Sequence, residues 1–228
     1  MKLSELRAFA RQQLDDEATP YLWSDAEINA HFVEAEQEAS IRAKLLYDRS
    51  QTITLATGVP TYYPDPNYVF FLFDRFYLAG INNRNLEART VDWMDSHHCG
   101  WEDAANGMPE YVLLDQTPRQ LRVWPTPSSD FNGSIVRLRG FRLPFGMTND
   151  NDEPEITEEL HRYLTDWVLY RCYEMQDSDA NNDAKARKHL SDFEMRFGVR
   201  PSAELQSLMY RRESMKPQPR MTFRLFGM

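Results

Sequence analysis

The spacing of apolar residues changes twice along this sequence, and that change limits the fold more than any other feature. Apolar residues recur every three or four positions in residues 3–48 and again in 157–212, which is typical of amphipathic helices. Between them, residues 51–143 contain short apolar or alternating runs separated by turn signals, which is typical of strands. The sequence therefore predicts an α+β fold: a mostly α-helical bundle with an inserted small antiparallel β-rich region and an extended C-terminal tail.

The clearest single helix signal lies near the start. Ser24 and Glu27 form a capping box, in which each side chain can bond to the other residue's backbone amide. The apolar residues that follow share one face and predict a helix over residues 24–48. Ala35 and Ala39 make one side of this helix thin, so a neighbouring helix could approach it closely.

Four further helices follow from the same spacing. One is expected over residues 3–14. Three are expected in the last third: 157–176, 182–197 with Gly198 as its stop signal, and a helix from Pro201 to about residue 212.

The middle of the chain is expected to supply the strands, with a short helix over residues 89–97. The predicted strands cover residues 52–55, 69–78, 110–114, 120–124 and 134–142. We divide the chain accordingly into four parts: residues 1–49 (first helices), 50–145 (β-rich insertion), 146–214 (last helices) and 215–228 (tail).

Charge and hydropathy exclude several classes of protein. The sequence has 26 Lys and Arg against 35 Asp and Glu, a net charge of −9, which argues against a protein that grips duplex DNA through its phosphates. The longest apolar stretch, residues 68–73, is far shorter than the roughly 20 residues of a membrane-spanning helix. Residues 1–5 lack the apolar segment of a secretory signal. We therefore expect a soluble intracellular protein.

No catalytic motif of the phosphate-binding, dinucleotide-binding, zinc-protease or nucleophile-elbow type is present. The adjacent His97, His98 and Cys99 could share a metal only across a sharp bend, so an exposed loop is the preferred interpretation. His161 and His189 fall on predicted helices among charged residues and are expected to be solvated. The sequence thus predicts no catalytic residue, no metal site and no cofactor.

Acidic residues cluster before the helix predicted at residue 157. Asp150, Asp152, Glu153 and Glu155 could bind calcium, but the stretch lacks the glycine and the terminal glutamate of an EF-hand loop. We prefer a solvated linker whose negative charge favours the N-terminus of the following helix.

One strand is expected to carry a basic face. Ile135, Arg137, Arg139 and Phe141 alternate with smaller or apolar residues and share one side. The two arginines could contact phosphates or pair with an acidic helix of a neighbouring copy, and the net charge favours the second. Trp124 could stack on a base or a sugar, or belong to the core, which is the preferred interpretation.

The C-terminal segment differs from the rest of the chain. Residues 211–228 hold five basic residues and one acidic residue, two prolines that prevent a helix, and an alternating apolar pattern from residue 221. Such a segment could add to a partner's sheet edge or groove, or fold back onto its own domain. The residues expected to make the partner contact are Arg220, Met221, Phe223, Arg224, Leu225 and Phe226.

Several stretches together resemble the head-to-tail adaptor (connector or neck) proteins of tailed phages, especially the podophage type. They are residues 21–28 (YLWSDAEI), 34–43, 121–127 (LRVWPTP) and 152–171, which opens with DEPEI. Their order and spacing carry the resemblance, which spans about residues 3–197.

The resemblance implies a structural role. Adaptors of this type form a ring, often of twelve copies, beneath the portal protein; they extend the DNA channel and offer a platform for the tail nozzle or tube. It implies that residues 215–228 dock onto the portal, that DNA passes without specific binding, and that no membrane is involved. The protein would be a non-enzymatic virion component of the neck, assembled in the host cytoplasm.

The same resemblance suggests where partners meet the chain. Ala35, Ala39, Arg137 and Arg139 are candidates for the interface between copies. Glu34, Glu38, Asp150 and Asp152 are candidates for an acidic channel face, because like charge repels the DNA phosphates.

Three other functions stay open at this point. They are a tail-completion or tube-terminating structural protein, a nucleic-acid-binding module that uses the basic face and tail, and a metal-dependent hydrolase that uses His97 and His98.

Overall fold

The computed structural model describes residues 1–80, 84–114, 120–175 and 182–202. They form two compact units, between which the chain passes several times. The helical unit comprises residues 1–47, 67–69 and 141–202, and the sheet unit comprises residues 48–66 and 70–140.

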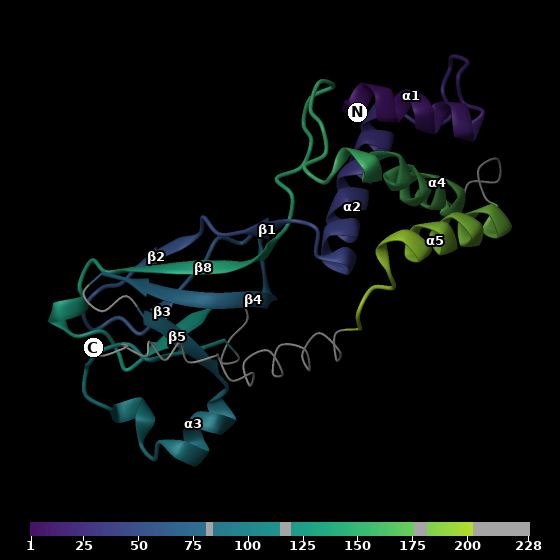
Figure 1. Cartoon of the computed structure of the whole chain (residues 1–228). Helices are drawn as coiled ribbons and strands as arrows, with labels where there is room; N and C mark the ends of the chain where they lie inside the picture. Colours follow the sequence, from purple (N-terminus) through teal and green to yellow (C-terminus); the bar gives the residue numbers. More distant parts are fainter. Residues whose placement is uncertain (81–83, 115–119, 176–181, 203–228) are drawn as a thin grey trace, which may run out of the picture. The chain divides into compact units, whose positions relative to one another are not determined.

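The helical unit is organised around one central helix, α2. Its elements are α1 (Leu3–Leu14), α2 (Asp25–Ala43), the 3-10 helix η3 (Glu158–Tyr163), α4 (Leu164–Glu174) and α5 (Asp183–Phe197). Helices α1, α4 and α5 each pack against α2, and α4 also packs along α5 (Figure 1).

Helix α2 begins as its capping box predicts. The Ser24 hydroxyl accepts a bond from the Glu27 amide, and the Glu27 carboxylate accepts one from the Ser24 amide. On its predicted face Ile28, Phe32, Ala35 and Ala39 are fully buried, whereas Ala43, the last residue of the helix, is exposed. The helix ends at Ala43, five residues before its predicted end, because Lys44 adopts a left-handed conformation (φ 54°).

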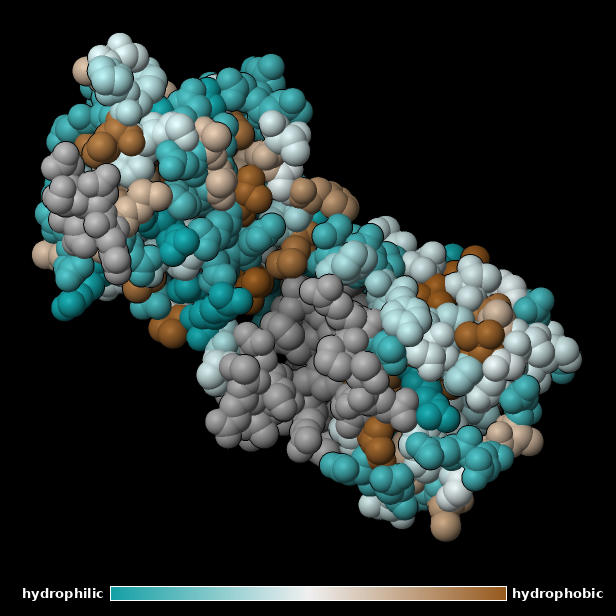
Figure 2. Space-filling model, turned by 180° about the vertical axis from the view of Figure 1, so that it is seen from behind, coloured by the Kyte–Doolittle hydropathy of each residue, from teal (hydrophilic) through white to brown (hydrophobic). Residues whose placement is uncertain are grey.

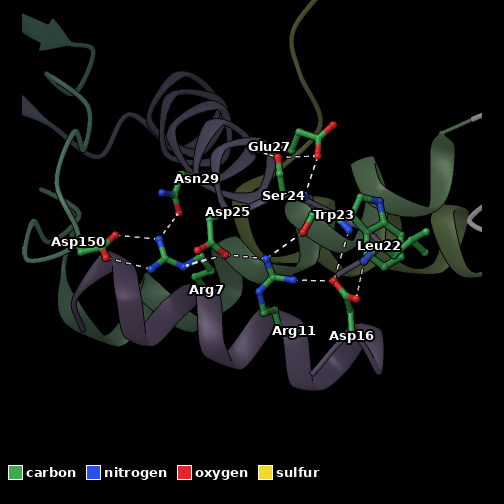
Figure 3. Close-up of polar contacts among 10 residues, drawn as sticks. All are labelled: Arg7, Arg11, Asp16, Leu22, Trp23, Ser24, Asp25, Glu27, Asn29 and Asp150. Carbon is green, nitrogen blue, oxygen red and sulfur yellow. Dashed lines mark hydrogen bonds and ion pairs between the residues drawn. The ribbon is translucent and has the colours of Figure 1, made fainter. Parts of the chain in front are cut away.

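A buried ion pair joins α1 to the loop that leads into α2 (Figure 3). The Arg11 guanidinium lies 2.6 Å from Asp16 Oδ2 and 2.6 Å from Asp25 Oδ1, and donates a bond to the Trp23 carbonyl. Asp16 in turn accepts bonds from the backbone amides of Leu22 and Trp23. Because Arg11 and Asp16 are 6% and 7% exposed, the charge of each depends on the other for compensation.

His161 is buried, so its predicted solvated position was wrong. It is 2% exposed; its Nε2 lies 2.9 Å from the Ile156 carbonyl and its Nδ1 3.0 Å from the Met1 amino group. A polar ring can be buried when both of its nitrogens have hydrogen-bond partners. The helical spacing of the sequence does not reveal these partners, so it could not predict that His161 is buried.

The described residues of the sheet unit form eight strands and one α-helix. The strands are β1 (Tyr47–Asp48), β2 (Thr52–Thr54), β3 (Thr61–Tyr62), β4 (Tyr68–Ala79), β5 (Arg84–Arg89), β6 (Tyr111–Leu113), β7 (Leu121–Trp124) and β8 (Ile135–Arg142), and the helix is α3 (Val91–His97). Strands β1, β4 and β8 begin or end in segments that belong to the helical unit.

The strands form a single sheet in the order β1-β8-β4-β5-β6-β7-β3, with β2 also paired to β8. Strands β5 and β6 run parallel, whereas the β2–β8, β3–β7, β4–β5 and β6–β7 pairs are antiparallel. The parallel pair requires a crossover, which residues 90–110 supply with α3 and the 3-10 helix η1 (Trp101–Asp103). Met94, Trp101 and Leu113 form a small core between α3 and this part of the sheet.

The predicted fold class was wrong in its balance. The chain is not a mostly helical bundle with a small antiparallel insertion: most of its eight-stranded, mixed and curled half-barrel sheet lies in a second compact unit. Strands β1 and β3 are too short to leave a pattern, and β5 is largely charged, with only Leu86 fully buried. The predicted C-terminal tail and the helix after Pro201 lie outside the described residues.

The Arg11 network gives a test of the helical unit. Replacing Arg11 by Met keeps much of the aliphatic stem but leaves the Asp16 carboxylate buried without its cation. We expect the free energy of unfolding of the helical unit to fall by about 3–5 kcal/mol, measured by urea unfolding followed by far-UV circular dichroism.

Arg7→Met is the matched control. Arg7 pairs with Asp150 and Asp25, whose side chains are 60% and 53% exposed, and ion pairs with such exposed partners contribute about 0–1 kcal/mol. Equal losses in the two variants would contradict a special role for the buried pair.

Candidate interaction surfaces

The negative charge of the chain is concentrated in the helical unit. The segments that form it contain 13 Lys and Arg against 22 Asp and Glu, a net charge of −9, while the segments 48–66 and 70–140 contain 8 against 11. The surface of the helical unit, at the left of Figure 2, is mostly hydrophilic, with apolar residues in small groups. This unit would therefore repel nucleic-acid phosphates more strongly than the sheet unit would.

Two of the predicted channel-face acids lie on α2 and already have basic partners. The Glu34 carboxylate, 39% exposed, is 3.2 Å from Arg171 Nε. The Glu38 carboxylate is only 9% exposed and lies 3.1 Å from Arg42 Nε and 2.8 Å from Arg200 Nη1. Glu34 is thus the more accessible of the two.

The other two predicted channel-face acids, Asp150 and Asp152, lie in the segment before η3 and form hydrogen bonds that fix its position. Asp150 accepts two hydrogen bonds from Arg7, of 2.8 and 3.0 Å. Hydrogen bonding to Arg7 lowers the pKa of the Asp150 carboxyl. Asp152 accepts bonds from the backbone amides of Asn149 and Thr148, which lower its pKa. All four acids therefore have structural partners within the chain, and their place at a channel face stays a prediction.

Ala35 and Ala39 are fully buried inside the helical unit. They belong to the same core as Val168 and Cys172 of α4, and α4 packs against α2. Their small side chains therefore allow close packing within one chain. Which residues meet a neighbouring copy stays a prediction.

Strand β8 carries the predicted basic face. Arg137 is exposed and Arg139 is half-buried, whereas Val136 and Leu138 are buried on the opposite side. Strand β2 lies beside them, with Thr52 opposite Arg137 in the antiparallel register. Within the part of the chain that the structure describes, neither arginine has an ion-pair partner, so both are available to an acidic partner.

His97, the last residue of α3, and His98, which follows it, belong to an aromatic cluster in the sheet unit. The His97 ring stacks on Trp93 at 4.4 Å, and the His98 ring lies 4.8 Å from Trp124. The Trp124 ring also stacks on Tyr111, with centroids 5.7 Å apart, and its indole nitrogen donates to the Trp101 carbonyl at 2.7 Å. The cluster thus accounts for these rings through packing within the chain.

Glu36 is a buried carboxylate that the sequence analysis missed. It is 0% exposed, its Oε1 accepts a 2.5 Å bond from the Glu155 amide, and its Oε2 has no partner among the described residues. Burial raises the pKa of Glu36 to about 7. Its position one turn after Phe32, on the apolar face of α2, is the sequence signal that could have revealed it.

The portal-contact residues predicted for the tail, Arg220 to Phe226, lie outside the described residues. Among the described helices, none is long and apolar enough to cross a membrane.

Glu36 makes stability depend on pH in a predictable direction. Its pKa is about 7 in the folded chain against an ordinary 4.5, so the folded state binds more protons between these values. The stabilisation is present below about pH 4.5 and is lost as the pH rises to 7. We expect Glu36→Gln to remove this loss, so that its free energy of unfolding relative to the wild type rises across this window by on the order of 3 kcal/mol.

The measurement is urea unfolding at a series of pH values. Glu34→Gln is the control, since Glu34 is on the same helix but partly exposed. If both variants follow the pH dependence of the wild type, the carboxyl of Glu36 does not titrate as the structure indicates.

Comparison with known proteins identifies the family of this chain. The family described as SU10 adaptor protein matches residues 1–217, which include both units. Among curated proteins, none matches the sequence significantly.

The match covers nearly the whole chain, and the family is one of phage structural proteins, not a known enzyme family. Its members are virion components that interact with other head and tail proteins. The chain belongs to the SU10 adaptor protein family of phage head-to-tail adaptors.

Proposed function

We propose that copies of this chain form a ring beneath the portal protein in the neck of the virion. The ring has twelve subunits, the number common among the adaptors that this chain resembles. The ring extends the DNA channel and gives the tail nozzle or tube its platform, after assembly in the host cytoplasm. The observation that carries this proposal is the adaptor family match over residues 1–217.

The charge of the helical unit supports a channel role. Its excess of acidic residues disfavours DNA binding, which suits a passage through which DNA must move freely. Of the four acids predicted for a channel face, Glu34 and Asp150 fit best, because their carboxylates are 39% and 60% exposed. Glu38 and Asp152 fit less well, since Glu38 is nearly buried and Asp152 is engaged with backbone amides.

A ring needs two different complementary surfaces on each copy. Arg137 and Arg139 on β8 form one such surface, and the acidic surface of the helical unit of the next copy is its counterpart. The absence of ion-pair partners for these arginines within the described residues supports this pairing.

The tail, residues 215–228, is the proposed portal anchor. Its basic and alternating apolar sequence, with Arg220, Met221, Phe223, Arg224, Leu225 and Phe226, suits addition to a partner's sheet edge or groove.

The first test is co-purification with the portal protein encoded by the same phage, followed by electron microscopy. We expect a ring of density under the portal. Retention of the tail nozzle or tube protein but not of the portal would instead support a tail-completion role.

Removing residues 215–228 should abolish portal binding while leaving the far-UV circular dichroism of the remaining chain intact. A variant of full length, with Phe223, Leu225 and Phe226 each replaced by Ser, separates the loss of apolar contacts from the loss of chain. Undiminished binding by both variants would reject the tail as the anchor.

Arg139→Glu should weaken ring assembly, because it places like charges in the proposed contact. The control is Arg187→Glu, a charge reversal at an exposed site on α5. Ring yield by electron microscopy or light scattering should fall for the first variant only, and an equal yield for both would reject the β8 contact.

A further inference from the structure

Helices α4 and α5 bring together three side chains of types that bind metal ions. Asp166 lies on α4, and His189 and Asp192 lie one turn apart on α5. One ligand atom from each lies within 4.8 Å of the other two, and His189 Nδ1 is 3.1 Å from Asp166 Oδ1. All three side chains are partly buried, so they are reachable but not freely solvated.

This is a ligand set that suits a divalent transition metal. Zinc binds imidazole nitrogen and carboxylate oxygen at about 2.0–2.2 Å in a tetrahedron, whose ligand atoms are then about 3.3 Å apart. The His189–Asp166 distance already matches one edge of such a tetrahedron. Magnesium and calcium prefer six or more oxygen ligands, so one nitrogen and two carboxylates favour zinc and its neighbours in the first transition series.

Among the described residues, no lysine or arginine forms an ion pair with either carboxylate, although basic residues lie nearby in sequence. Arg162, one turn before Asp166, stacks on Phe9, and Arg196, one turn after Asp192, stacks on Tyr163. Lys185 is bonded to the Tyr173 hydroxyl, so it too has another partner.

The remaining nearby base is Lys188, one turn before Asp192. Within the described residues, no ion pair joins these two side chains. Among the described residues, His189 is thus the ion-pair partner of Asp166, and the negative charge of the two carboxylates is available for a cation to balance.

The scaffold around the three residues is well packed. The His189 ring stacks on Tyr173, with centroids 6.0 Å apart, and Phe193 of α5 packs against Trp167 of α4 at 5.0 Å. Phe193 is fully buried, and Trp167 and Tyr173 are nearly so. Because the helix pair is held by this core, the three side chains need little rearrangement to meet a common ion.

We propose that Asp166, His189 and Asp192 bind one divalent transition-metal ion, zinc above all, which ties α4 to α5. The ion takes the place of the proton that His189 and Asp166 share in their hydrogen bond, and solvent completes its coordination. His189 was predicted to be a solvated surface residue, because Asp166 approaches it only in the folded chain.

The test is titration of the full-length protein, stripped of metal by a chelator, with zinc chloride in a calorimeter. We expect one ion per chain with micromolar affinity. His189→Ala and the near-isosteric Asp192→Asn should each weaken binding at least tenfold. Zinc should also raise the thermal unfolding temperature of the wild type but not of either variant.

His98→Ala is the matched control, since His97 and His98 are adjacent in sequence and form a second candidate zinc-binding position, and this variant should bind zinc as the wild type does. Far-UV circular dichroism shows whether each variant is folded. No binding below millimolar zinc, or binding unchanged by both Asp192→Asn and His189→Ala, would overturn the proposal. Loss of binding in His98→Ala alone would place the zinc at the α3 histidines and overturn it equally.

Discussion

The helical unit depends on one continuous apolar stripe along α2. Ile28, Phe32, Ala35 and Ala39 are each 0% exposed, and α1, α4 and α5 all pack on this helix. Burying a side chain the size of Ile or Phe stabilises a fold by roughly 1.5–3 kcal/mol, and the alanines let neighbouring helices approach without leaving voids. A polar or larger residue on the stripe would disturb three helix contacts at once.

Polar groups buried beside that stripe hold the irregular segments of the unit. Arg11 bonds to the Trp23 carbonyl, Glu36 to the Glu155 amide, and His161 to the Ile156 carbonyl. Because a buried polar group is costly unless it is bonded, these bonds determine where the loop before α2 and the segment before η3 lie. The helices are therefore positioned by apolar packing, and the segments between them by polar groups that this packing shields from water.

The distribution of charge connects this architecture to the adaptor family. The helical unit has the larger excess of acidic residues, whereas β8 of the sheet unit presents Arg137 and Arg139 without ion-pair partners in the described part of the chain. Opposite charges on different surfaces of one chain suit contacts between copies, since electrostatic complementarity sets which surfaces meet. The family match covers both units, so the adaptor role belongs to the chain as a whole.

Local signals in the sequence determined most of the helices and the longer strands. The Ser24 capping box placed α2, and alternation placed β8, because helix caps, helix hydrogen bonds and side-chain alternation all lie within a few residues of one another. Only the tertiary structure decided that the charged segment Arg84–Arg89 is an interior strand, since its hydrogen-bond partners come from β4 and β6. Only the tertiary structure likewise decided that Glu34, Glu38 and Asp150 pair with Arg171, Arg200 and Arg7, and that Glu36 and His161 are buried. Each depends on residues distant in sequence, and proximity of that kind is created by folding.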